Sequence, residues 1–187
     1  MEEMNRKEFL AKTGTAVAAT YILSTNAACN TEESKMDRKL RFANLDEAVN
    51  ELKNIETASK ITPNGEWSWY QIINHCAQSI EYSLIGYPEN KAALFRMTAG
   101  KIASSLFASR GYMSHDLNAP IPKAPEIPKV GNEKEAMLRL YQAIEDFKKF
   151  SGELKMHFAY GELSKKDYDQ AHAMHIANHL SFVNVEA

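Results

Sequence analysis

Three histidines share one short stretch near the C-terminal end of this 187-residue chain, in the string AHAMHIANHL: His172, His175 and His179. On an α-helix with 3.6 residues per turn, spacings of three and four place their side chains within about 60° of one another. His175 and His179 lie one turn apart, so both imidazole rings can reach the same metal ion. Such pairs also occur by chance on solvated helices, and this spacing alone does not establish a metal site.

A metal site of this kind needs a third ligand, and His75 in the string YQIINHCAQ is the natural donor. Gln71, Gln78, Ser79 and Tyr82 share its predicted helix face, where they are expected to hydrogen-bond to the ligand rings or to a bound water. An inward-facing polar strip costs stability unless its groups are satisfied, which favours a functional site over a plain core.

The elements that must position these histidines are predicted to be helices. Apolar residues recur at helical spacing, and no alternating Val-, Ile- or Thr-rich run of strand length follows residue 40. The predicted helices cover residues 45–58, 67–85, 91–109 with an interruption at Gly100, 132–154 and 165–184. Thr62–Gly65 is predicted to be a turn, and Ser164–Asp167 resembles a capping box that opens the last helix. Four prolines make residues 119–130 an extended connection.

These elements predict an all-α fold, a four-helix bundle with a long crossover connection between helices two and three, over residues 88–130. Cys76, Trp67 and Trp69 are expected to pack in the core or at its rim. The expected organisation is one bundle domain, residues 41–187, without an internal repeat.

The first 28 residues have the order of a bacterial export signal: a charged start, then an uncharged stretch of about 13 residues that is too short to span a bilayer. Arg6 and Lys7 resemble the twin-arginine pair, and the general secretory route is the alternative. Cys29, after two alanines, is a lipidation candidate; simple cleavage and a retained N-terminal helix are the other two interpretations. Residues 29–40 are predicted to be a flexible tether, so the protein is expected in the periplasm or as a membrane-anchored lipoprotein of the cell envelope.

Composition excludes several classes of protein. With 22 Lys and Arg against 24 Asp and Glu, the chain has a net charge of −2, so no nucleic-acid partner is expected. Two cysteines cannot form a disulfide framework. Ser-His-Asp order, a Gly-rich phosphate loop and a CxxC motif are all absent from the sequence, which leaves a metal ion as the candidate catalyst.

The strings GEWSWYQIINHCAQSIEYSLIGYP, IPKAPEIP and HFAYGELSKKDYDQAHAMHIANHL together resemble the DinB-like superfamily, in particular its branch of uncharacterised exported proteins. The resemblance covers roughly residues 40–185. It implies a four-helix bundle with a three-histidine metal site between helices two and four. His75 matches the helix-two ligand of that site, and His175 and His179 match its HxxxH pair. His172 is an additional histidine, expected to support the ligands or to act as an alternative ligand.

The segment 157–161, HFAYG, resembles the HPxFG turn that precedes the last helix in this superfamily, with Phe158 and Ala159 departing from the pattern. That turn often lies near the mouth of the site, but the resemblance gives no role to His157. Members with known activities include thiol-dependent transferases and isomerases. Those thiols are cytoplasmic, so this chemistry fits an exported chain poorly.

The sequence therefore predicts an exported metal-binding protein, a small-molecule metalloenzyme of unassigned reaction using zinc, nickel or iron. The alternative is a non-catalytic envelope protein that binds a ligand or partner in the bundle groove, and metal storage or transfer ranks third. The expected partner is a small-molecule substrate. A lipid anchor to the membrane and a homodimer are further alternatives that the sequence leaves open.

Overall fold

The computed structural model describes residues 37–186. The predicted signal segment 1–28, the lipidation candidate Cys29 and most of the tether lie outside the described residues, so these remain predictions. In the part of the chain that the structure describes, no helix combines the length and the apolar character that a membrane span requires.

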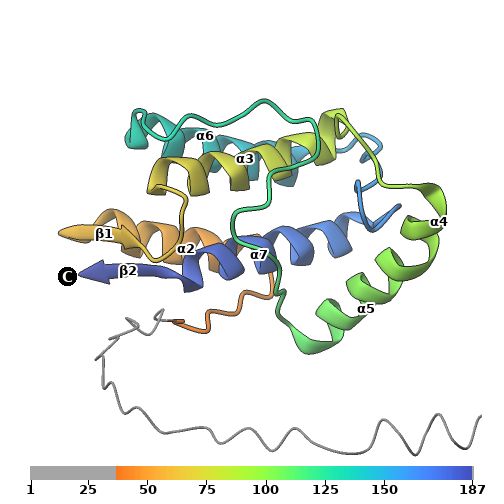
Figure 1. The fold of residues 1–187 in the computed structure, drawn as a ribbon, viewed down its shortest axis with the longest axis horizontal. Helices are drawn as coiled ribbons and strands as arrows, with labels where there is room; N and C mark the ends of the chain where they lie inside the picture. Colours follow the sequence, from red (N-terminus) through yellow and green to blue (C-terminus); the bar gives the residue numbers. More distant parts are fainter. Residues whose placement is uncertain (1–36, 187) are drawn as a thin grey trace, which may run out of the picture. The chain divides into compact units, whose positions relative to one another are not determined.

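Four long helices form the bundle (Figure 1): α2 (Leu45–Glu56), α3 (Trp69–Ile85), α6 (Glu133–Lys149) and α7 (Lys165–Ser181). Helix α3 packs against both α6 and α7, and α2 packs against α7. The prediction of an all-α bundle is confirmed.

Helices α2 and α6 each bury one stripe of apolar side chains. In α2 the buried stripe consists of Leu45, Ala48, Leu52 and Ile55, at spacings of three and four. Burying a Leu or Ile side chain stabilises the fold by about 1.5–3 kcal/mol. Helix α7 differs, because almost all of its residues from His172 to Ser181 are buried. Its polar side chains therefore enter the interior, where they need partners.

The two helices that bear the predicted ligands, α3 and α7, both begin with a capping box. Ser68 accepts the backbone N–H of Gln71, and Gln71 caps the backbone of Ser68 in return, which forms a capping box at the start of α3. Ser164 and Asp167 form the second box at the start of α7, so that prediction is confirmed. Losing such a Ser cap costs about 1 kcal/mol.

The structure also contains a small sheet, which the sequence analysis did not predict. Strand β1 (Lys60–Pro63) pairs antiparallel with β2 (Val183–Glu186). The last helix therefore ends at Ser181 rather than at 184, and the turn predicted from Thr62 begins only at Asn64. Valines at 183 and 185 alternate with polar residues, as in a strand, but the run is only four residues long.

Helix α6 ends at Lys149, not at 154, because the backbone of Phe150 turns extended at ψ 124° before Ser151 and Gly152. A side-chain carbon at Gly152 would lie 2.7 Å from the Phe150 ring, so the chain passes close to that ring.

The crossover between α3 and α6 begins as a helix and then becomes extended. Helix α4 (Ala93–Phe95), a π-helical turn η1 (Arg96–Gly100) and α5 (Lys101–Arg110) follow one another, and Gly111 ends them at φ +70°. Gly100 was expected to interrupt this helix, yet it is helical at φ −63°. A glycine stands there because a Cβ would lie 1.9 Å from the carbonyl oxygen of Ala159.

The N-cap residue of α3 and two side chains of the helix itself hold the second half of the crossover. Ser68 donates a hydrogen bond to the carbonyl of Lys129, Gln71 to that of Ile127, and Gln78 to that of Pro125. The extended segment therefore runs along α3 before it reaches α6 (Figure 1).

Gly100→Ala is expected to lower the free energy of unfolding by roughly 1–3 kcal/mol, because the new methyl group overpacks against Ala159. Urea denaturation measures the change. Ser105→Ala in α5 is the matched control, since Ser105 is exposed and alanine is the better helix former. A Gly100→Ala protein more stable than the wild type would contradict the close approach, because helix propensity alone favours alanine.

Candidate metal centre

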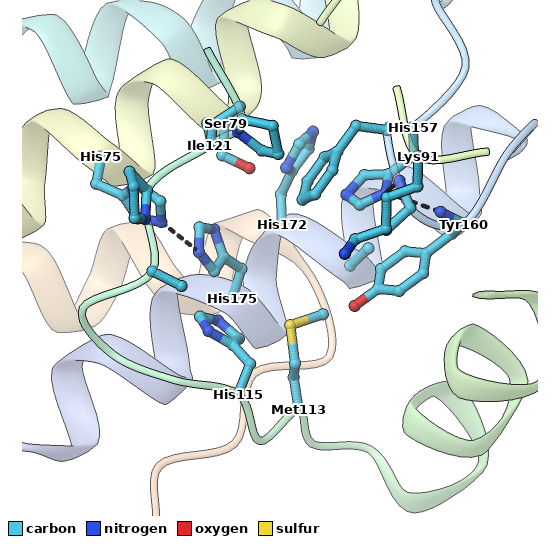
Figure 2. A pocket seen from close by; sticks show the side chains of 16 residues that line it. His75, Ser79, Lys91, Met113, His115, Ile121, His157, Tyr160, His172 and His175 are labelled. Carbon is cyan, nitrogen blue, oxygen red and sulfur yellow. Dashed lines mark hydrogen bonds between the residues drawn. The ribbon is translucent and has the colours of Figure 1, made fainter. Parts of the chain in front are cut away.

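The three predicted ligands come together between α3 and α7. His75 lies in the middle of α3, and His175 and His179 lie one turn apart on α7. The Nε2 atom of His175 lies 3.1 Å from the Nε2 of His75 and 3.1 Å from the Nε2 of His179. The ligand atoms of all three residues lie within 4.8 Å of one another. Figure 2 shows the His75 and His175 rings with a nitrogen of each directed at the other.

This convergence fits a metal ion better than a network of hydrogen bonds. A ring nitrogen offers either one proton or one lone pair, so the His175 Nε2 can satisfy only one of its two neighbours. Two nitrogens bound to one ion at about 2.0–2.1 Å stand about 2.8–3.4 Å apart for bond angles near 90–110°. The observed 3.1 Å separations lie within this range. Two of the three pairs of histidines therefore already have the spacing that a shared ion requires, and the third pair lies within 4.8 Å.

The surroundings keep these rings neutral, the form that binds metal. Burial, with a smaller contribution from the nearby His115, lowers the pKa of His75 to about 3. Burial also lowers the pKa of His175 and of His179 well below the ordinary value, and neighbouring histidines add to that effect. Three neutral imidazoles, each with one free nitrogen lone pair, therefore lie close together at neutral pH.

Trp67 packs against two of the three candidate ligand rings. Its ring stacks on His179 with an angle of 2° between the planes and lies edge-on to His75, with centroids 4.8 Å apart. The Nδ1 atoms of His75 and His179 are buried without a hydrogen-bond partner among the described residues. In a ring that ligates through Nε2 this atom bears the proton, and a buried water is the usual partner when the protein supplies none.

The polar residues predicted to support the ligands have other contacts in the structure. The amides of Gln71 and Gln78 donate to crossover carbonyls, as described above, and Tyr82 packs against Tyr87 with ring centroids 5.8 Å apart. The two glutamines therefore hold the crossover against α3.

A cavity of about 330 Å³ opens beside His75 and His175. Its lining residues come from α3, α7, the crossover and the turn before α7, and several of them are labelled in Figure 2. Most of the lining is apolar. Among the lining residues Lys91 is the single Lys or Arg, and there is no Asp or Glu.

The sequence resemblance gave His157 no role, yet it orders one wall of this cavity. Its backbone exchanges two hydrogen bonds with Gly161, of 2.8 and 3.0 Å, which close a tight turn. The His157 Nδ1 accepts the backbone N–H groups of Ala159 and Tyr160, both at 3.1 Å. An acceptor Nδ1 bears no proton, so in the neutral ring the Nε2 bears it.

His172 also lies on the cavity wall, but the structure places it apart from the group of converging nitrogens. Its ring packs between Phe147 and Tyr168, with centroids 5.3 and 5.2 Å away. Its Nε2 is buried and has no hydrogen-bond partner in the described part of the chain.

His115 is the residue that sequence reasoning missed. It arrives from the crossover, and its ring centroid lies 5.0 Å from that of His175 and 5.2 Å from that of His179. The helical spacing that revealed the other histidines has no meaning in an extended segment, so no sequence signal pointed to it.

Comparison with known proteins places the chain in one family. A family model described as "Protein of unknown function (DUF1569)" matches residues 34–186, so the chain belongs to that family. No curated protein matches the chain. No solved structure matches it either.

The buried neutral state of His157 predicts a pH dependence of stability in the metal-free protein. Burial, with a smaller effect of His172, lowers its pKa to about 3. Between pH 6.5 and 3 the unfolded chain therefore binds the extra proton. The free energy of unfolding is expected to fall with decreasing pH, by about 1 kcal/mol per pH unit for each such histidine.

Urea denaturation with a chelator present, between pH 6 and 4.5, measures this slope. His157→Gln is expected to reduce it by about 1 kcal/mol per pH unit. Tyr160→Phe, a change in the same turn that leaves no group titrating in this range, should give a curve parallel to that of the wild type. An unchanged slope in His157→Gln would show that the ring is protonated in the folded protein.

Proposed function

We propose that this member of an uncharacterised family is a metal-dependent enzyme acting on a small molecule, with His75, His175 and His179 as ligands of one divalent transition metal ion. The convergence of their three Nε2 atoms beside a cavity is the observation on which the proposal depends. The resemblance to the DinB-like superfamily supports it further, since the same three positions match the ligands of that superfamily.

Three imidazole ligands leave at least one coordination position for water or substrate, which is typical of catalytic rather than structural sites. A divalent ion held there would act as a Lewis acid on a substrate atom or on a bound water. An all-imidazole set suits zinc, nickel and iron, and disfavours the oxygen-seeking ions Mg²⁺ and Ca²⁺.

The residues of the chain itself would bind and orient the substrate. The apolar lining excludes water from an organic molecule of modest size, and His157 offers its Nε2–H as a hydrogen-bond donor. Lys91 supplies a positive charge, and no carboxylate in the lining opposes it. The cavity therefore suits a neutral or anionic substrate with an apolar body.

The second candidate is a non-catalytic protein of the cell envelope that binds a ligand in the same cavity. The observation in its favour is that a wall of the cavity comes from the extended crossover, through Met113, Ile121 and neighbouring prolines. In this case a ligand would bind equally well to the metal-free protein. In the enzyme, removal of the metal would abolish turnover.

The full chain, purified without a polyhistidine tag, is expected to hold about one equivalent of transition metal by elemental analysis, because the three ligands are preformed. Replacing both His175 and His179 by Ala should reduce the content below about a tenth of an equivalent, since one imidazole cannot hold the ion. His157→Gln is the matched control and should retain the metal. A metal-free wild-type protein, or an unchanged double variant, would refute the proposal.

Benzoate and benzylammonium, two probes of similar size and opposite charge, test the predicted substrate class. In the Co²⁺-loaded protein, benzoate is expected to perturb the visible spectrum at lower concentration than benzylammonium. Lys91→Met should weaken benzoate binding by roughly two- to fivefold, the effect of one exposed charge, and Lys91→Arg should preserve it. Equal benzoate affinity in the wild type and in Lys91→Met would exclude Lys91 from recognition.

A further inference from the structure

We propose that His115 is a fourth ligand of this metal ion, supplied by the crossover. The inference rests on the metal site proposed above and assigns a function to a residue outside the bundle helices. With four histidine ligands, the position for water or substrate in the proposed enzyme requires a five- or six-coordinate ion. Four observations support it: the position of the ring, the proton on one nitrogen, the unpartnered state of the other, and the freedom of the segment that bears it.

The ring of His115 belongs to the same cluster as the three bundle histidines. Centroid distances within that trio are 4.8 to 5.0 Å, and the distances from His115 to His175 and His179 are 5.0 and 5.2 Å. Figure 2 shows the His175 ring between those of His75 and His115. His115 therefore approaches the cluster from a direction that no helix of the bundle supplies.

The hydrogen bond of His115 fixes the position of its proton. Its Nδ1 lies 2.8 Å from the carbonyl oxygen of Asp116, and because a carbonyl only accepts, the Nδ1 donates. Burial lowers the pKa of His115, which keeps the ring neutral, although Asp116 opposes this shift. In a neutral ring with a proton on Nδ1, the Nε2 bears the free lone pair.

No hydrogen-bond donor of the described residues reaches that lone pair. The His115 Nε2 is buried and lacks a hydrogen-bond partner among the residues that the structure describes. A ligating histidine is typically held in this way, with one nitrogen donating to a backbone carbonyl and the other directed at the ion. Of the four clustered rings, His115 is the one for which such an orienting bond to a carbonyl is present.

A modest inward movement of the crossover completes the site, since the nitrogens that lie within 4.8 Å of one another do not include those of His115. The N-cap and side chains of α3 hold the crossover at 125–129, as described above. Residues 112–119, within the described chain, make hydrogen bonds only among themselves. The segment that bears His115 can therefore adjust while the far half of the crossover stays in place.

Titration with Co²⁺ and competition with a chelator test the inference in the full chain. The wild type and His115→Ala should each bind one Co²⁺, but the affinity of His115→Ala should be at least about tenfold lower, with a changed visible spectrum. Added imidazole should restore the wild-type spectrum by occupying the vacated position. Asp116→Asn is the matched control, because the Nδ1 proton is donated to the backbone and not to this side chain.

Hydrogen exchange of the crossover backbone provides a second measurement. Metal binding should slow hydrogen exchange of the 112–119 backbone in the wild type, and this protection should be absent from His115→Ala. His115→Gln, which preserves bulk and polarity, should behave like His115→Ala if ligation is the cause. Far-UV circular dichroism establishes that each variant is folded.

The outcomes separate the two proposals. Equal affinity and identical spectra in the wild type and His115→Ala would overturn the fourth ligand and leave the three-histidine site standing. A wild type that binds no Co²⁺ would overturn both. Weaker binding with a changed spectrum and lost protection would support both.

Discussion

The close approach of three neutral imidazole nitrogens inside the α3–α7 interface is the constraint on which the rest of the structure depends. Polar rings in a helix–helix interface destabilise a bundle unless something binds them. The residues around the rings fix their positions but do not offset the free-energy cost of burying them. Two capping boxes fix where the two helices of the site begin, and the Trp67 ring stacks on His179. The fold is thus organised to present three lone pairs to a single point.

Much of this arrangement could be predicted from the sequence, because helical periodicity is regular and long. The positions of His75, His175 and His179 followed from spacing together with a family resemblance, and the structure brings all three together. The β1–β2 pair escaped prediction because strands of four residues contain too few alternations to stand out. Its long-range pairing depends on tertiary contacts, not on local preference.

The contribution of the crossover to the site could not be predicted from the sequence. An extended, proline-rich segment has no periodicity that relates one side chain to another, so the position of His115 follows only from what the segment packs against. Gln71 and Gln78 illustrate the same limit of sequence reasoning. Their helix face was predicted correctly, but their amides bind backbone carbonyls that no sequence pattern places nearby. The face of a helix on which a residue lies follows from local spacing. Its hydrogen-bond partners in distant segments depend on the tertiary fold.

The absence of carboxylates from the cavity lining has a consequence for charge balance. Histidine ligands are neutral, so a divalent ion among them would keep both of its positive charges, and Lys91 would add a third nearby. Buried charge of one sign is costly, and electroneutrality would have to come from solution. An anion from solution would then accompany the metal ion in the resting site. The choice of buffer salt would then decide what occupies the cavity of the purified protein.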